Sequence, residues 1–179
     1  MINHSKNASG ADNQQERPGI KGWIVGFTDG EGCFSVSIFR NKTTKLGWQI
    51  FPEFVITQSE KSLDALELFR KYFDCGRIFV NKRYDNHNEN LYRFCVHSIQ
   101  DLHEKIIPFF KKNKLRTHKQ KDFKIFSEIV EKMMKKKHLT SKGMMGIAQR
   151  IKTMNRKNPS KFLESSETIR QASAKPKKI

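Results

Sequence analysis

The sequence has few acidic residues for its size. In 179 residues, 18 Asp and Glu stand against 35 Lys and Arg, giving a formal net charge of +17. The excess is uneven: residues 99–179 carry 22 basic against 7 acidic side chains, a net of +15, while residues 1–98 carry a net of only +2. Positive charge at this density would repel itself without a counter-charge, so we expect a polyanionic partner. Nucleic acid is favoured over a membrane surface or a merely solvated face.

Long apolar runs and cysteine pairs are also missing. No stretch approaches the roughly 18 consecutive apolar residues that a membrane span requires, and residues 1–17 lack the apolar run of a secretory signal. We therefore expect a soluble, intracellular chain with no membrane partner. The three cysteines, Cys33, Cys75 and Cys95, are odd in number and lack metal-ligand spacing, so we expect reduced thiols rather than a disulfide framework or a zinc site.

The sequence motifs of two common classes of phosphate-binding or phosphate-cleaving protein are absent as well. The chain has no GxxxxGK[ST] phosphate loop and no clustered His-Asn-His arrangement. Strands of period two argue against a helix-turn-helix protein.

The pattern of apolar residues predicts an α+β domain. Alternating positions predict strands over 33–39, 48–57, 77–83 and 91–97. Helical spacing predicts helices over 18–29, from Ser62 to before Cys75, and over 99–110, 119–137 and 142–156. The order is α-β-β-α-β-β-α-α-α, in which two α-β-β units form one antiparallel sheet with helices on one face. The domain is expected to span residues 18–165, between a disordered tail at 1–17 and a basic tail at 166–179.

Two carboxylates close the first predicted helix, in the segment WIVGFTDGEGCF at residues 23–34. The helix dipole disfavours acids at this end, so Asp29 and Glu31 must cap the next element, pair with basic side chains or hold a divalent cation. Gly22 and Gly26 share one helical face and would let a second backbone approach closely. If two copies of the helix pack together, their acids meet. Oxygen ligands of this kind suit Mg²⁺ or Ca²⁺, and such metals promote phosphodiester hydrolysis.

Residues 24–32, IVGFTDGEG, resemble the signature of the LAGLIDADG homing endonucleases. The resemblance implies the αββαββα fold of that family, with a saddle-shaped antiparallel sheet and additional C-terminal helices. One copy of the signature is present, and single-motif members act as homodimers on nearly palindromic DNA. The positions expected at the dimer interface are Gly22, Trp23, Gly26, Phe27 and Asp29.

The resemblance also implies roles for individual residues. Glu31 would bind the metal together with the Gly30 carbonyl, while Asp29 would brace the helix rather than bind metal. Gln58 matches a position that orders water near the metal. The family's basic residue, usually lysine, falls at His118, which is a departure, and Lys119 or Lys121 lies close enough to replace it. Mg²⁺ is the expected cofactor, and Ca²⁺ is expected to bind without supporting cleavage.

The outward positions of the predicted strands would read DNA in the major groove. Arg83 and Arg93 are candidates for guanine, Gln49 for adenine and Glu53 for cytosine. The full set of expected DNA-binding residues is Ser35, Ser37, Phe39, Arg40, Asn41, Lys42, Lys45, Gln49, Phe51, Glu53, Phe79, Asn81, Arg83, Arg93, Cys95 and His97.

The leading hypothesis is a site-specific homing endonuclease that makes metal-dependent double-strand cuts. Two alternatives stay open: an RNA maturase that assists splicing of its host intron, and a DNA-binding protein that has lost cleavage. The resemblance suggests an organelle, chloroplast or mitochondrion, as the location, and intron RNA as a further possible partner.

Overall fold

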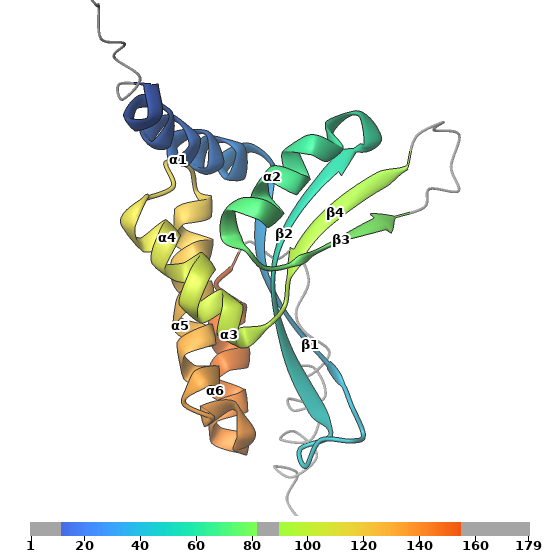
Figure 1. The fold of residues 1–179 in the computed structure, drawn as a ribbon. Helices are drawn as coiled ribbons and strands as arrows, with labels where there is room; N and C mark the ends of the chain where they lie inside the picture. The colour runs from blue at the N-terminus through green and yellow to red at the C-terminus, as the bar shows by residue number, and fades with distance from the viewer. Residues whose placement is uncertain (1–11, 82–89, 155–179) are drawn as a thin grey trace, which may run out of the picture.

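The computed structural model describes residues 12–81 and 90–154 (Figure 1). Its helices and turns are α1 (Asp12–Glu31), η1 (Glu60–Ser62), α2 (Leu63–Phe73), α3 (Ile99–Asp101), η2 (Leu102–Ile106), α4 (Ile107–Lys112), α5 (Lys119–Met134), η3 (Lys137–Leu139) and α6 (Ser141–Ile151). Its strands are β1 (Gly32–Arg40), β2 (Trp48–Ser59), β3 (Arg77–Asn81) and β4 (Leu91–Val96). The predicted order of α-β-β-α-β-β followed by helices is confirmed.

The four strands form one antiparallel sheet in the order β1-β2-β4-β3. The strands of each α-β-β unit pair with each other, and β2 pairs with β4 to join the units at the centre. Phe34, Val36 and Ile38 of β1 are buried, whereas Ser35 and Ser37 between them are only half-buried. The predicted faces of β1 are therefore correct.

Phenylalanine fills the space between the sheet and its helices. The ring of Phe34 lies 4.9 Å from Phe54 of β2, 5.4 Å from Phe110 of α4, and 5.2 and 5.4 Å from Phe123 and Phe126 of α5. These contacts fix α4 and α5 on the inner face, and Figure 1 shows both helices on the same side of the sheet. Burial of several aromatic side chains supplies a large apolar area to this core.

The first helix starts earlier than predicted, at Asp12 rather than at residue 18. Residues 12–17, DNQQER, include several strong helix formers, so the helix continues past Pro18 towards the N-terminus. The predicted disorder of residues 12–17 is thereby corrected. Residues 1–11 and the basic tail at 166–179 lie outside the described residues.

The helix predicted over 99–110 is divided. It contains a π turn, η2, between α3 and α4. Pro108 stands in the first turn of α4, and its missing N–H cannot continue the regular hydrogen-bond ladder. The wider π turn just before it accommodates this loss.

Among residues 12–81 and 90–154, no helix combines the length and the apolar character that a membrane span requires.

Candidate active site and nucleic-acid interface

The acidic turn, residues 29–31, lies where α1 ends and β1 begins. Glu31 is the last residue of α1 and is exposed, as is Gly30. Thr28, just before the turn, is fully buried. Gly32, just after it, is also buried and begins the pairing of β1 with β2. The turn thus presents one carboxylate to solvent from a rigid junction of helix and sheet.

Gly32 has no room for a side chain. A Cβ at this position would lie 2.6 Å from Cγ2 and 2.8 Å from the carbonyl oxygen of Thr28. We therefore expect Gly32→Ala to lower the free energy of unfolding by about 1–3 kcal/mol, the usual cost of overpacking. Urea denaturation followed by circular dichroism measures this change.

The matched control is Gly146→Ala in the middle of α6, an exposed position where an added Cβ would meet nothing within 4 Å. Because alanine favours a helix over glycine by about 1 kcal/mol, this variant should be at least as stable as the parent chain. Equal stability of both variants would show that the Thr28 contact does not constrain Gly32.

Asp29 is anchored within its own chain. Its Oδ2 accepts a hydrogen bond from the backbone N–H of Arg116 at 2.8 Å, and its Oδ1 accepts from the N–H and the hydroxyl of Thr117 at 3.1 and 2.7 Å. Partial burial alone would raise the pKa of Asp29, but these hydrogen bonds and the charge of Lys119 outweigh it and lower the pKa. Asp29 is therefore ionised at neutral pH and ties α1 to the loop before α5.

Lys119 reaches the acidic turn. Its ammonium donates to the carbonyl oxygen of Gly30 at 2.7 Å and to that of Thr28 at 3.2 Å. His118 directly precedes α5 and is exposed. Of the two basic residues left open by the sequence, Lys119 is the one whose charged group lies at the end of α1. It offsets the negative end of the helix dipole there.

Gln58 is brought towards the same corner by strand register. Gly32 is the first residue of β1 and pairs with Ile56, and β2 continues beyond this pair to Ser59, so Gln58 lies at the end of the sheet where α1 joins β1. Gln58 is half-buried and pairs with Tyr92 of β4.

The oxygen atoms at the end of α1 fit a hard divalent cation. The Glu31 carboxylate and the Gly30 carbonyl are the donor types that Mg²⁺ and Ca²⁺ prefer. The Gly30 carbonyl already accepts a positively charged group, the ammonium of Lys119. A metal at this carbonyl would therefore share or displace the contact with Lys119.

The outer face of the sheet carries most of the residues predicted to contact DNA. Register places three rows across it: Phe39 beside Gln49, Ser37 beside Phe51, and Ser35 beside Glu53. The outer residues of β3 are Phe79 and Asn81, both exposed. Arg40, Lys42 and Lys45 are exposed at the β1–β2 turn. Arg83 lies outside the described residues.

Several of these polar side chains pair with one another. Oε2 of Glu53 lies 3.4 Å from Nη2 of Arg93, and its Oε1 lies 3.2 Å from Nδ1 of His97. Asn41 donates to Oε1 of Gln49 at 2.6 Å. Any base contact by Arg93 or Gln49 must therefore replace an existing partner.

Cys95 requires a correction. Register places it on the outer face as predicted, opposite Val55, but it is only 3% exposed and cannot serve as a direct DNA contact. Burial and the neighbouring Glu53 carboxylate raise the pKa of its thiol to about 11, against the opposing charge of Arg93. The thiol is therefore protonated at neutral pH.

One side of α1 consists of glycines. Gly22, Gly26 and Gly30 recur every four residues and are exposed, and a Cβ added at any of them would meet no described atom within 4 Å. The aromatic residues of the predicted dimer interface have contacts inside the chain: the Trp23 ring lies 4.8 Å from Phe27 and 5.5 Å from Phe69 of α2. Trp23 remains 38% exposed.

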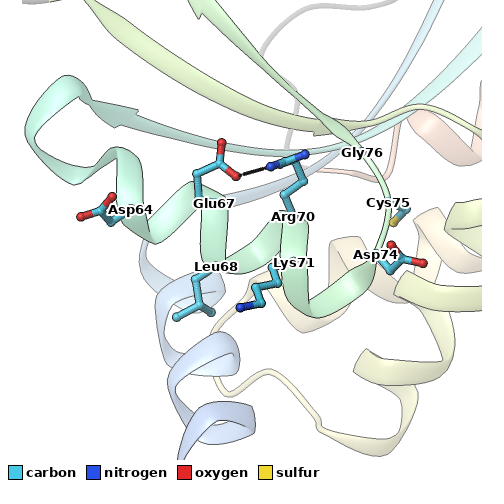
Figure 2. A pocket seen from close by; sticks show the side chains of 8 residues that line it. All are labelled: Asp64, Glu67, Leu68, Arg70, Lys71, Asp74, Cys75 and Gly76. Atoms are coloured by element: carbon cyan, nitrogen blue, oxygen red, sulfur yellow. Dashed lines mark hydrogen bonds and ion pairs between the residues drawn. The ribbon is translucent and has the colours of Figure 1, made fainter.

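The hollow drawn in Figure 2 is a separate feature. It follows α2 and is lined by Asp64, Glu67, Leu68, Arg70, Lys71, Asp74, Cys75 and Gly76. Glu67 and Arg70 form an ion pair at 2.7 Å. None of the lining residues belongs to the acidic turn, and this open groove is not the candidate active site.

Sequence reasoning missed the loop that holds Asp29. The N–H groups of Arg116 and Thr117 that bind the carboxylate are 87 and 88 positions away in sequence. No local pattern marks such a pair. Every residue except proline carries a backbone N–H group, so only the folded structure shows which of these groups donate to Asp29.

Comparison with known proteins places these features in context. The family model described as LAGLIDADG endonuclease matches residues 24–130. A probable intron-encoded endonuclease of Neurospora crassa is 36% identical over 133 residues, which cover 74% of this chain and 28% of the relative. The chain spans about a quarter to a third of the length of the first curated relatives that it matches.

Two solved structures share the fold. The crystal structure of the homing endonuclease I-TnaI superposes with a TM-score of 0.72 at 38% identity, covering 83% of this chain and 97% of that one. I-SmaMI, bound to an uncleaved DNA target in the presence of calcium ions, gives a TM-score of 0.72 at 32% identity over 81% of this chain and 47% of that one.

Proposed function

Because the chain belongs to the LAGLIDADG endonuclease family, we propose that it is a site-specific DNA endonuclease that hydrolyses phosphodiesters in both strands. The observation that carries the proposal is the acidic turn itself. An exposed carboxylate, Glu31, stands beside the Gly30 carbonyl and the Lys119 ammonium at the corner where helix meets sheet. An open sheet face with polar side chains begins at the same corner.

Glu31 and the Gly30 carbonyl would hold Mg²⁺. When bound, the metal stabilises the charge that develops on a phosphate under attack and activates water. The role of Glu31 is to fix the metal by one full negative charge. The role of Asp29 is to hold α1 against the loop before α5, through its three hydrogen bonds to Arg116 and Thr117.

Lys119 and Gln58 complete the site. The Lys119 ammonium would stabilise negative charge on the phosphate, since it is already fixed at the turn by two carbonyl oxygens. Gln58 would orient the attacking water by hydrogen bonding. His118 would contribute less than Lys119, because the hydrogen bonds to the acidic turn come from the Lys119 side chain.

The sheet would read the DNA through its outer face. Serine, asparagine and glutamine on this face offer hydrogen bonds to base edges, and the exposed Arg40, Lys42 and Lys45 would contact phosphates. With a net charge of +17, binding should weaken steeply as salt rises. Phe39, Phe51 and Phe79 would make apolar contacts such as those to thymine methyl groups.

Two chains would form the active enzyme. The given sequence carries one copy of the acidic signature, and it covers 97% of I-TnaI but 47% of the I-SmaMI chain. The exposed glycine side of α1 would let the same helix of a second subunit approach closely, which places two acidic turns side by side. A symmetric dimer in turn favours a nearly palindromic target.

The dimer proposal predicts the effect of a bulky residue on the glycine side. A Cβ at Gly26 would meet nothing within 4 Å in the single chain, so Gly26→Leu should keep the fold while self-association weakens by about 10²-fold or more from steric overlap with the second subunit. Sedimentation equilibrium measures the dissociation constant. Lys132→Leu on α5 is a distant control and should dimerise as the parent does. Unchanged association of the Gly26→Leu chain would remove α1 from the interface.

A library of plasmid targets tests the function as a whole. The full chain is incubated with the library in Mg²⁺, in Ca²⁺ and with chelator, and free ends are mapped by sequencing. We expect double-strand cuts at one nearly palindromic site in Mg²⁺ and binding without cleavage in Ca²⁺. Tight binding with no cleavage in any metal would refute the catalytic proposal, and intron RNA would then be the next substrate to test.

We propose an organelle, chloroplast or mitochondrion, as the location, because several relatives are named as intron-encoded endonucleases and one as a protein in an ND4 intron. Fractionation of host cells with immunodetection of the chain tests this assignment. Detection only outside organelles would contradict it.

A further inference from the structure

Three side chains of metal-binding type meet on the outer face of the sheet, apart from the acidic turn. They are the carboxylate of Glu53 in β2, the thiol of Cys95 in β4 and the imidazole of His97, which directly follows β4. One ligand atom from each lies within 4.8 Å of the other two. We refer to these residues as the Glu-Cys-His cluster.

The sheet holds the cluster in place. β2 and β4 are the two central strands, and their register pairs Phe54 with Val96 and Val55 with Cys95. Glu53 is therefore level with His97. Cys95 and His97 are two residues apart and share a face. All three ligands project from the most constrained part of the sheet.

The distances suit a tetrahedral zinc ion. Nitrogen and oxygen ligands bind zinc at about 2.0–2.2 Å, which places them roughly 3.3 Å apart in tetrahedral geometry. Nδ1 of His97 lies 3.2 Å from Oε1 of Glu53. Sγ of Cys95 lies within 4.8 Å of both atoms and would move towards them to complete three ligands of the ion.

Even without a metal, an ion pair between Arg93 and Glu53 explains why some of these side chains lie together. The guanidinium of Arg93 forms an ion pair with Glu53 at 3.4 Å, whereas Nδ1 of His97 lies 3.2 Å from the carboxylate but is buried without a hydrogen bond in the described structure. The Cys95 thiol is 3% exposed, donates weakly to the backbone carbonyl oxygen of Arg93 at 3.8 Å and faces the same carboxylate, so a metal ion would replace these weak contacts. A thiolate beside Glu53 would be repelled, unless a cation lay between them.

We propose that Glu53, Cys95 and His97 form a binding site for a zinc-type divalent transition metal, with a fourth position open to water. A set of sulfur, nitrogen and oxygen donors selects zinc or cobalt over Mg²⁺ and Ca²⁺, which prefer oxygen alone. On binding, the metal–sulfur bond forms as the thiol proton leaves to solvent. This site is chemically distinct from that at Glu31, and its existence does not depend on DNA cleavage.

Arg93 sets the strength of the site. Its guanidinium shares Glu53 with the ion, so the positive charge competes with metal binding. Arg93→Gln should therefore tighten binding by about fivefold, the scale of a partly exposed ion pair. A structural role of the cluster without metal would show no such effect.

Cobalt titration of the full chain tests the site. Co²⁺ bound by a thiolate gives a sulfur-to-metal charge-transfer absorption in the near ultraviolet, which nitrogen and oxygen ligands do not produce. The background is Cys33→Ser/Cys75→Ser, in which Cys95 is the only thiol of the chain's three. We expect the band to appear, to saturate at one ion per chain and to vanish on addition of zinc.

Substitution of each ligand identifies the site. In the same background, Cys95→Ser should abolish the band, and Glu53→Gln and His97→Gln should each weaken cobalt binding by at least about tenfold. His103→Gln, a half-buried imidazole in η2 outside the cluster, is the control and should leave cobalt affinity unchanged. Circular dichroism verifies the fold of each variant, and if Cys95→Ser does not fold, the other two ligand variants decide.

Two results would overturn the proposal. One is the absence of a thiolate–cobalt band in the background chain. The other is a band whose affinity is unchanged in both Glu53→Gln and His97→Gln.

Discussion

The Glu31→Gln chain should bind its DNA target as tightly as the parent chain and fail to cut it. The substitution keeps the size of the side chain and removes its negative charge. Glu31 is exposed at the end of α1, so the fold does not depend on that charge being buried or paired in the core. Loss of a metal-binding carboxylate should slow cleavage by about 10³-fold or more, which corresponds to roughly 4 kcal/mol of transition-state stabilisation.

Single-turnover cleavage and a gel-shift measurement in Ca²⁺ separate the two effects. The matched control is Glu67→Gln, which removes a surface carboxylate from α2, where it pairs with Arg70. That chain should cut at the parent rate. Full activity of Glu31→Gln would show that the metal is held elsewhere. An equal loss of DNA binding would give Glu31 a role in the interface rather than in catalysis.

Replacing Lys119 with methionine should lower the cleavage rate by about 10²-fold with little change in DNA affinity. Methionine preserves most of the apolar length and removes the ammonium that contacts the carbonyls of Thr28 and Gly30. A fixed positive group of this kind commonly contributes 10²- to 10³-fold through electrostatic stabilisation. The expected loss follows from the position of Nζ at the acidic turn.

His118→Ala is the decisive comparison, because the family position falls on His118 while the contact belongs to Lys119. We expect the cleavage rate of His118→Ala to stay within about threefold of the parent rate, below the contribution of a general acid or base. The rates are measured under single turnover with saturating protein, and urea denaturation checks stability. A large loss in His118→Ala with a small one in Lys119→Met would reverse the two roles.

The local pattern of apolar and polar residues was sufficient to predict the order of the helices and strands and the buried face of β1. Phe34, Val36 and Ile38 alternate with polar residues, and the structure buries those three, because a strand turns successive side chains to opposite faces. The start of α1 was predicted wrongly, because Pro18 was taken as the first turn whereas the helix begins at Asp12. The π turn before Pro108 was not predicted either, because a missing N–H does not by itself specify whether a helix ends, kinks or widens.

The residues of the candidate site also fall into two groups, those that the sequence identified and those that it did not. Glu31 and Gly30 could be identified because the whole turn lies within one short segment. The sequence did not decide between His118 and Lys119, because the side chains of adjacent residues at the start of a helix point in different directions. The turn that Lys119 contacts is also 89 positions away in the chain. Spacing of the cysteines predicted no metal site, and Cys95 gained metal-binding neighbours only when β2 paired with β4.

By itself the sequence determined the excess of positive charge, the order of helices and strands, the inner and outer faces of β1 and the acidic turn. These depend on composition or on backbone geometry over a few residues. Only the tertiary structure decided which basic residue meets the turn, what anchors Asp29, and that Glu53, Cys95 and His97 lie together. Such contacts join residues far apart in the chain, and their positions depend on how the complete aromatic core packs the helices against the sheet.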